Sequence, residues 1–184
     1  MSESDFFENF LHMDSEGQFR LAIGAARDGD VDLVRAYIER GRRDLDMPDD
    51  NGVVLFHHAV DSENIEVVSL LLKEPSLDPN IPDSYGRSAL HRAMEFGSSK
   101  EMIAFLLAND RINPNQRDDE GNSTLHSAVL YKPDAADILL ADPRVDVNIR
   151  NKSGRTPFLA AVQQMFFEEY LNATSISVVE KFLG

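Results

Sequence analysis

The 184-residue sequence contains no cysteine, which excludes two kinds of structural site. Without thiols the chain forms neither disulfide bonds nor thiolate metal centres. Disulfides belong to oxidising compartments and are rare in the reducing cytoplasm and nucleus. We therefore expect a cytoplasmic protein, with the nucleus as the second candidate compartment.

Long apolar runs are also missing from the chain. A membrane-spanning helix needs about 20 consecutive apolar residues, and no stretch of this sequence approaches that length. The first residues, MSESDFFENF, are acidic, whereas a secretory signal peptide begins with basic residues. Hydrophobic residues still make up 42% of the chain, which is enough for a core. We expect one soluble domain that does not associate with membranes.

Basic residues are scarce relative to acidic ones. The chain has 18 Lys and Arg against 32 Asp and Glu, a formal net charge of −14 at pH 7. A negative field repels phosphate backbones, so nucleic acid is not an expected ligand. A protein partner is expected to present a basic or neutral surface. The alternative is that the acidic residues serve only to keep the protein soluble.

Four glycines recur at nearly constant spacing along the chain. Gly52, Gly86, Gly121 and Gly154 are separated by 34, 35 and 33 residues. They open the similar phrases GVVLFHHA, GRSALHRA, GNSTLHSA and GRTPFLAA. Three of these phrases continue into a second apolar stretch and a polar return that ends at Asn80, Asn115 and Asn148. Self-similarity at this period is typical of a repeat architecture.

The phrases resemble the ankyrin repeat family, whose repeat opening is usually written G-x-T-P-L-H-x-A. The resemblance covers residues 18–184 and implies an all-α solenoid of about 4.5 to 5 helix-turn-helix repeats with β-hairpin-like loops. Segment 1–15 precedes a repeat domain at 16–184. We place the repeats at about 18–49, 50–82, 83–117, 118–150 and 151–184, the last with an extended first helix.

The two ends of the chain depart from the regular repeat. Segment 1–15 carries Phe6, Phe7, Phe10 and Leu11, which we expect to cover the first repeat as a short helix; a disordered or partner-binding segment is the alternative. In the last repeat the extra segment QQMFFEEYLNA has high helical propensity and lengthens the first helix. It is interpreted as a second cap or as an apolar docking surface.

No residue pattern in the chain favours catalysis. There is no Gly-rich phosphate loop, no His-Glu-x-x-His and no G-x-S-x-G. His57, His91 and His126 occupy one repeat position, so successive copies lie too far apart to share a zinc ion. The resemblance implies that this histidine ties each hairpin to the next repeat. Accordingly, no catalytic residue, metal or cofactor is predicted. The residues that open the first helices are predicted N-caps: Ser88, Ser123 and Thr156.

In the ankyrin repeat family, partners usually dock on the hairpin tips and on the inner face of the first helices. Tyrosine and arginine are enriched in interface hot spots. Phe96 and Tyr131 occupy matched positions and are expected either to form one apolar patch or to pack against their own loops. The predicted partner-binding residues are Asp50, Asn51, Asp61, Tyr85, Arg87, Glu95, Phe96, Asp119, Glu120, Leu130, Tyr131 and Arg155.

The resemblance therefore implies a protein–protein interaction module, acting as scaffold, adaptor or inhibitor, and not an enzyme. Its expected oligomeric state is monomeric by default. The alternative hypothesis is that the chain is the regulatory or targeting segment of a larger multidomain signalling enzyme or of a secreted microbial effector, whose catalytic domain follows Gly184.

Overall fold

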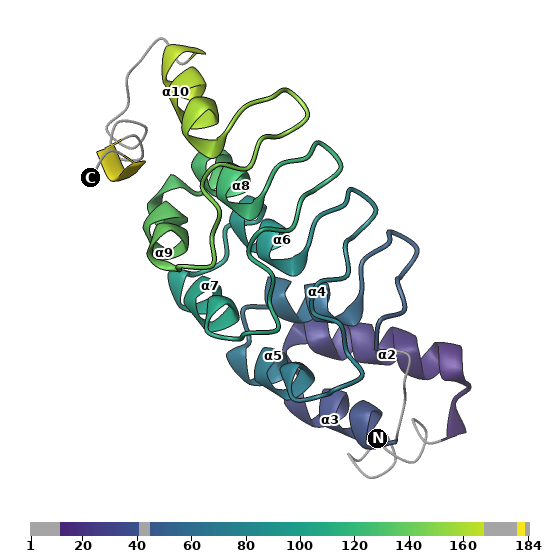
Figure 1. Ribbon diagram of the computed structural model, residues 1–184. Helices are drawn as coiled ribbons and strands as arrows, with labels where there is room; N and C mark the ends of the chain where they lie inside the picture. The colour runs from purple at the N-terminus through teal and green to yellow at the C-terminus, as the bar shows by residue number, and fades with distance from the viewer. Residues whose placement is uncertain (1–11, 41–44, 168–179, 183–184) are drawn as a thin grey trace.

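The computed structural model describes residues 12–40, 45–167 and 180–182, with the backbone alone at 165–167. The inner layer holds one helix from each pair, and the outer layer holds its partner (Figure 1). The inner helices are α2 (Ser15–Asp28), α4 (Leu55–Asp61), α6 (Ala89–Glu95), α8 (Thr124–Tyr131) and α10 (Pro157–Phe167); the outer ones are α3 (Val31–Glu39), α5 (Ile65–Leu72), α7 (Lys100–Leu107) and α9 (Ala136–Ala141), which follows a short 3₁₀ turn, η1 (Pro133–Ala135).

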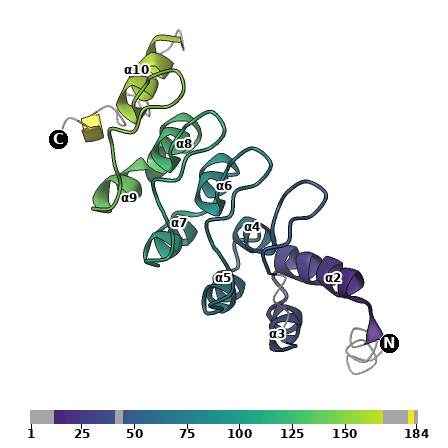
Figure 2. The same cartoon turned by 45° about the vertical axis from the view of Figure 1, so that its right-hand side comes forward.

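The predicted all-α stack of helix pairs is confirmed. Hairpin loops project from one side of the stack ahead of α4, α6, α8 and α10, and Figure 2 shows their parallel arrangement. Short antiparallel bridges join Pro48 to Val54 and Arg117 to Ser123 at the base of two hairpins. Among the described residues, every helix is too short or too polar to cross a lipid bilayer.

Side-chain oxygens at the helix starts explain where several helices begin. Ser88 accepts a hydrogen bond from the backbone N–H of His91, as predicted for a helix N-cap. Thr156 Oγ1 accepts one from the N–H of Leu159 at 3.3 Å. Before α4 the equivalent residue is Val54, which has no side-chain acceptor. That helix is therefore held by packing more than by capping.

The core lies between the layers and runs through all the helix pairs. Ala59, Ala93 and Ala128 are 0% exposed, because small side chains let neighbouring inner helices approach closely. Burying one large apolar side chain stabilises the fold by about 1.5–3 kcal/mol, and the outer helices supply a continuous series of them. These fully buried side chains are Val67, Val68, Leu71, Met102, Ile103, Leu106 and Leu139. Leu70, Phe105 and Ile138 are only partly buried at its edge.

Each hairpin tip is built by one carboxylate or amide and one glycine. In the third repeat, Asp83 Oδ1 accepts hydrogen bonds from the N–H groups of Tyr85 and Arg87 at 2.9 and 3.0 Å. Gly86 follows at φ 75°, a backbone conformation that is unfavourable for residues that have a Cβ atom. Asp49, Asp118 and Asn151 accept the equivalent bonds at the other tips.

The return loops on the opposite side are joined from repeat to repeat. Asn80 donates to the carbonyl of Arg111 at 2.8 Å and accepts from the N–H of Asn113 at 2.8 Å. Asn115 makes the same pair of bonds to the following loop. Side chains of Arg111 and Arg144 donate to carbonyls at the end of the preceding outer helix. These contacts fix the spacing between repeats on this side.

The C-terminal part of the stack departs from the predicted pattern at one point. Pro133 opens the short 3₁₀ turn η1, and α9 begins only at Ala136. Further on, the ring of Phe182 contacts Phe158 of α10 with centroids 5.6 Å apart. Lys181 lies 3.7 Å from Asp137 of α9. The expectations for Phe6, Phe7, Phe10, Tyr170 and Leu171 lie outside the described residues, and the proposed division at residue 15 stays a prediction.

Candidate functional site

The predicted partner-binding residues fall into two rows along the stack. One row lies on the hairpin tips, and the other lies at the C-terminal ends of the inner helices. We call the surface that contains both rows the inner face. The tip row holds Asp50, Asn51, Tyr85, Asp119 and Glu120, with Arg87 and Arg155 just after their tips; the helix-end row holds Asp61, Glu95, Phe96, Leu130 and Tyr131.

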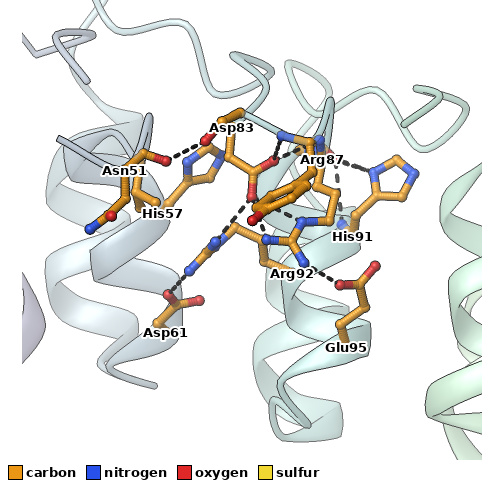
Figure 3. Close-up of polar contacts among 12 residues, drawn as sticks. Asn51, His57, Asp61, Asp83, Arg87, His91, Arg92 and Glu95 are labelled. Atoms are coloured by element: carbon orange, nitrogen blue, oxygen red, sulfur yellow. Dashed lines mark hydrogen bonds and ion pairs between the residues drawn. The ribbon is translucent and has the colours of Figure 1, made fainter. Parts of the chain in front are cut away.

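The centre of the inner face is the carboxylate of Asp83, whose side chain is only 1% exposed. Its Oδ2 accepts from Arg87 Nε at 2.9 Å, Arg87 Nη2 at 2.8 Å and Arg92 Nη1 at 3.1 Å (Figure 3). Burial acts to raise the pKa of Asp83, but the hydrogen bonds from Arg87 and the tip backbone outweigh it and hold the pKa below its usual value. Asp83 is therefore a charged anchor within the fold.

Both arginines extend from Asp83 to a second acid. Arg87 Nη1 lies 2.5 Å from Glu95 Oε2 at the end of α6. Arg92 Nη2 lies 2.5 Å from Asp61 Oδ2 on α4, in the preceding repeat (Figure 3). The pKa of Arg87 is raised: burial acts to lower it, and the bonds to Asp83 and Glu95 more than compensate. The network joins a hairpin and two inner helices.

The aromatic side chains of Tyr85 and Phe96 lie against this network and remain open to solvent, as does Tyr131 on the next inner helix. Tyr85, Phe96 and Tyr131 are 66%, 59% and 61% exposed. The Arg87 guanidinium carbon lies 4.8 Å from the ring centroid of Tyr85 and 5.4 Å from that of Phe96. Arg92 lies 4.7 Å from the same Phe96 ring. Such cation–π contacts orient the rings and leave their outer surfaces available.

The predicted patch of Phe96 and Tyr131 is only partly supported by these positions. Both rings are exposed at matched places on adjacent inner helices. The contacts that orient Phe96, however, are with Arg87 and Arg92. The membership of these residues in a binding surface stays a prediction.

The repeated histidines have the structural role that the sequence suggested. In His91, Nδ1 accepts from the backbone N–H of Ser88 at 3.3 Å, while Nε2 lies 3.1 Å from the carbonyl oxygen of Asn122 in the next hairpin. His126 repeats this arrangement with Ser123 and Arg155. Since Nδ1 accepts and Nε2 donates, the ring is neutral. Burial lowers the pKa of both histidines, which agrees with that neutral form.

A serine hydroxyl close to a histidine is also the arrangement of a nucleophile and its base. Ser88 Oγ lies 2.8 Å from His91 Nδ1, but Ser88 is 2% exposed and His91 is 0% exposed. A nucleophile must reach its substrate, and this hydroxyl does not. In addition, no group of three His, Cys, Asp or Glu side chains within the described ranges is placed to hold a metal ion.

Sequence reasoning missed Arg92 and treated Asp83 only as a turn residue. A signal was available in the position between the repeated histidine and alanine, which the family pattern leaves free. Arg92 and His58 both occupy it, and each pairs with the acid nine residues earlier, Asp83 or Asp49. His58 Nε2 lies 2.9 Å from Asp49 Oδ2. A titratable residue at this position therefore indicates an internal pair with the hairpin.

Comparison with known families agrees with the helix pairing. The family model described as "Ankyrin repeats (3 copies)" matches the chain twice, over residues 22–118 and 76–151. None of the curated proteins matches the chain.

Proposed function

Since this chain belongs to the ankyrin repeat family, we propose that it is a protein-binding module that acts through its inner face, as a scaffold, adaptor or inhibitor. Ankyrin repeats are in general protein–protein interaction modules. The partner is held by the hairpin tips and the ends of the inner helices, and the chain acts by binding and not by catalysis. Its own oligomeric state is monomeric in this proposal.

One observation carries the proposal: three large aromatic residues are exposed, and two of them, Tyr85 and Phe96, lie against the ionic network. Tyr85, Phe96 and Tyr131 are each more than half exposed, whereas the large side chains of the core are buried almost completely. Exposing such area to water is unfavourable, at about 25 cal/mol per Å² of apolar surface. A partner that covers these rings recovers that free energy, and contiguous aromatic surface is typical of interaction sites.

The ionic network supports binding by holding the surface in place. Arg87 and Arg92 are each bonded to two acids and packed against rings. Ordering a long side chain on binding costs about 0.5–1.5 kcal/mol. Here these side chains are already ordered in the free protein, so a partner avoids that cost.

The charge of the inner face supports a basic or neutral partner. The predicted site contains the acids Asp50, Asp61, Glu95, Asp119 and Glu120. Glu95 and Asp61 are paired with Arg87 and Arg92. The acids left for a partner are therefore Asp50, Asp119 and Glu120, against the exposed Arg155. An acidic or nucleic-acid partner would meet repulsion, whereas a basic one gains a faster association rate.

The test is affinity capture from a lysate of the source organism with two forms of the chain. The variant Tyr85→Ala, Phe96→Ala, Tyr131→Ala removes the exposed rings and leaves the ionic network intact. We expect a protein that the wild-type chain retains to be lost by this variant. Arg87 is not substituted, because its removal would leave the buried carboxylate of Asp83 underpaired.

A matched control is Ile65→Ala, which removes an exposed apolar residue from the outer helix α5. Thermal unfolding of every variant must agree with the wild type, since the three rings are exposed. Equal retention of the same proteins by the ring variant, the control and the wild type would contradict the proposal.

A further inference from the structure

The tip row alternates in chemical character from repeat to repeat. Asn51, Tyr85 and Glu120 occupy matched positions, as do Asp50, Ser84 and Asp119. The middle tip therefore carries serine and an aromatic ring over these two positions, whereas the second tip carries the carboxylate of Asp50 and the fourth tip those of Asp119 and Glu120. Its own acid, Asp83, is buried and bonded to two arginines. Along the stack, the open groups read acid, aromatic, acid.

The three tips form one continuous edge. The Ser84 hydroxyl donates to the carbonyl of Asn51, which joins the second tip to the third. The N–H of Asp119 donates to the carbonyl of Tyr85 at 3.0 Å and joins the third tip to the fourth. The order of charges along this edge is thus fixed by the fold. A partner segment can therefore match this order with its own sequence of basic and apolar side chains.

The carboxylates at the two ends of this edge are free to bind. Asp50, Asp119 and Glu120 are exposed, and none of the three side chains bonds to another described residue. At the fifth tip the matched residue is Lys152, which is also exposed and carries the opposite charge. A cation is therefore favoured at the second and fourth tips and disfavoured at the fifth.

The spacing of these charges defines the partner. Neighbouring helices in a stack lie about 8–10 Å apart, so the second and fourth tips are about 16–20 Å apart. An extended chain rises about 3.3 Å per residue, so five or six residues span roughly that distance. We propose that the inner face binds an extended segment of a partner protein in which two basic side chains, about six residues apart, flank an apolar side chain that lies an even number of positions from each and therefore points to the same side.

The apolar side chain belongs in the middle because the cations there are already supplied. Arg87 and Arg92 lie against the rings of Tyr85 and Phe96. The two arginines already occupy the cation-binding faces of these rings, whereas an aliphatic side chain covers the exposed ring surface that remains. The basic groups instead reach Asp50 at one end and Asp119 and Glu120 at the other. This inference rests on the proposed function, because it assigns the partner's chemistry to the same surface.

Two synthetic peptides of identical composition test the spacing. In the first, two arginines stand about six residues apart with leucine about two residues after the first of them, so that all three side chains point to one side of the extended chain, and glycine and serine fill the rest; in the second, the arginines are adjacent at one end. Binding is measured by titrating each peptide into the isotope-labelled protein and following the NMR chemical shifts of its backbone amides. We expect the first peptide to bind about three- to fivefold more tightly, since two exposed ion pairs form at once only with the matched spacing. The largest chemical-shift changes that the first peptide causes in the protein should lie at Tyr85 and Phe96.

Charge-matched variants separate this geometry from net charge. The inner variant is Asp50→Asn, Asp119→Asn, Glu120→Gln. The outer variant, Asp32→Asn, Glu66→Gln, Glu101→Gln, changes exposed acids in the first turns of outer helices by the same charge. The spaced peptide should bind the inner variant about fivefold more weakly and the outer variant nearly as well as the wild type. Equal binding of the two peptides, or equal weakening by both variants, would overturn the inference.

Failure of this inference is distinguishable from failure of the proposed function. If the peptides are not discriminated while the ring variant still loses a captured protein, the spacing rule is wrong and the binding surface stands. If the peptides leave Tyr85 and Phe96 unperturbed and the ring variant captures the same proteins as the wild type, both are wrong.

Discussion

Arg92 on α6 reaches across a repeat boundary to Asp61 on α4, with Nη2 2.5 Å from Oδ2. The same guanidinium lies 3.1 Å from the buried carboxylate of Asp83. A single side chain thereby connects two inner helices to a hairpin. A buried charge is tolerated only where partners of opposite sign surround it. The stability of the third repeat therefore depends on all members of this network.

Removing Asp83 should be severely destabilising. Asp83→Ala leaves Arg87 and Arg92 without their shared anion and removes two bonds to the tip backbone. Breaking a buried pair from one side costs about 3–5 kcal/mol. Urea unfolding measures the loss. As control, Asp119→Ala on the next tip should change the free energy of unfolding by no more than about 0.5 kcal/mol; similar effects of the two changes would contradict the role of Asp83.

Stability should fall as the pH is lowered from 7.5 towards 4.5. Burial, with the nearby charge of Arg92, lowers the pKa of His57 to about 4 from its ordinary 6.5. Below pH 6.5 the unfolded chain protonates His57, whereas the folded chain keeps it neutral until the pH nears its lowered pKa. Protonation therefore favours the unfolded chain, and the stability that His57 contributes above pH 6.5 is lost as the pH falls towards 4. Burial lowers the pKa of His91 and His126 in the same direction.

The measurement is the free energy of unfolding in urea at a series of pH values. For His57 alone the expected loss across this window is on the order of 3 kcal/mol. The variant His57→Gln should show a shallower pH dependence than the wild type, whatever its absolute stability. His12 is exposed, so His12→Gln should keep the full dependence. An unchanged slope in His57→Gln would rule out His57 as the source.

Replacing Asp46 by asparagine should stabilise the protein. Asp46 accepts from the N–H of Asp78 at the place where later repeats use Asn80 and Asn115. Burial raises the pKa of Asp46, with the charge of Asp78 adding to it. An amide keeps the acceptor, removes the repulsion and adds a donor, which is worth about 0.5–1.5 kcal/mol for one hydrogen bond.

The reverse substitution is the matched control for that change. Asn80→Asp should destabilise by a similar amount, because it removes the donor to the Arg111 carbonyl. Thermal unfolding of both variants at neutral pH tests the pair. A lower melting temperature for Asp46→Asn than for the wild type would show that the charge at this loop is favourable.

Two tip glycines distinguish backbone strain from steric clash. Gly86 and Gly154 have nearly equal φ values, 75° and 74°. A Cβ at Gly86 would lie 2.6 Å from the backbone nitrogen of Asp119, whereas one at Gly154 meets nothing within 4 Å. Gly154→Ala should therefore cost about 1–2 kcal/mol, the price of a left-handed conformation alone.

Gly86→Ala should cost at least about 1 kcal/mol more than Gly154→Ala, since packed backbone has little room to relax. Chemical unfolding of the two single variants gives both values. Equal losses would mean that the tips move apart easily. That result would also weaken the fixed spacing on which the peptide inference depends.

Much of the fold could be predicted from the sequence because the same sequence pattern occurs in several repeats. The spacing of Gly52, Gly86, Gly121 and Gly154 placed every regular hairpin tip. Ser88 and Thr156 were recognisable as helix starts, and the role of His91 followed from its repeated position. The 3₁₀ turn that begins at Pro133 could not be predicted in this way, because that connection differs from the other repeats and no second copy indicates its structure.

The sequence by itself determined the register of this protein: which residues turn, which begin helices and which face the next repeat. Local backbone preferences and the burial of apolar positions are sufficient for that, since each acts over a few residues. Only the tertiary structure decided that Arg87 and Arg92 are paired internally beneath exposed rings. Their partners, Asp61, Asp83 and Glu95, come from three elements. A long charged side chain can point in many directions, and the packing of neighbouring repeats selects one.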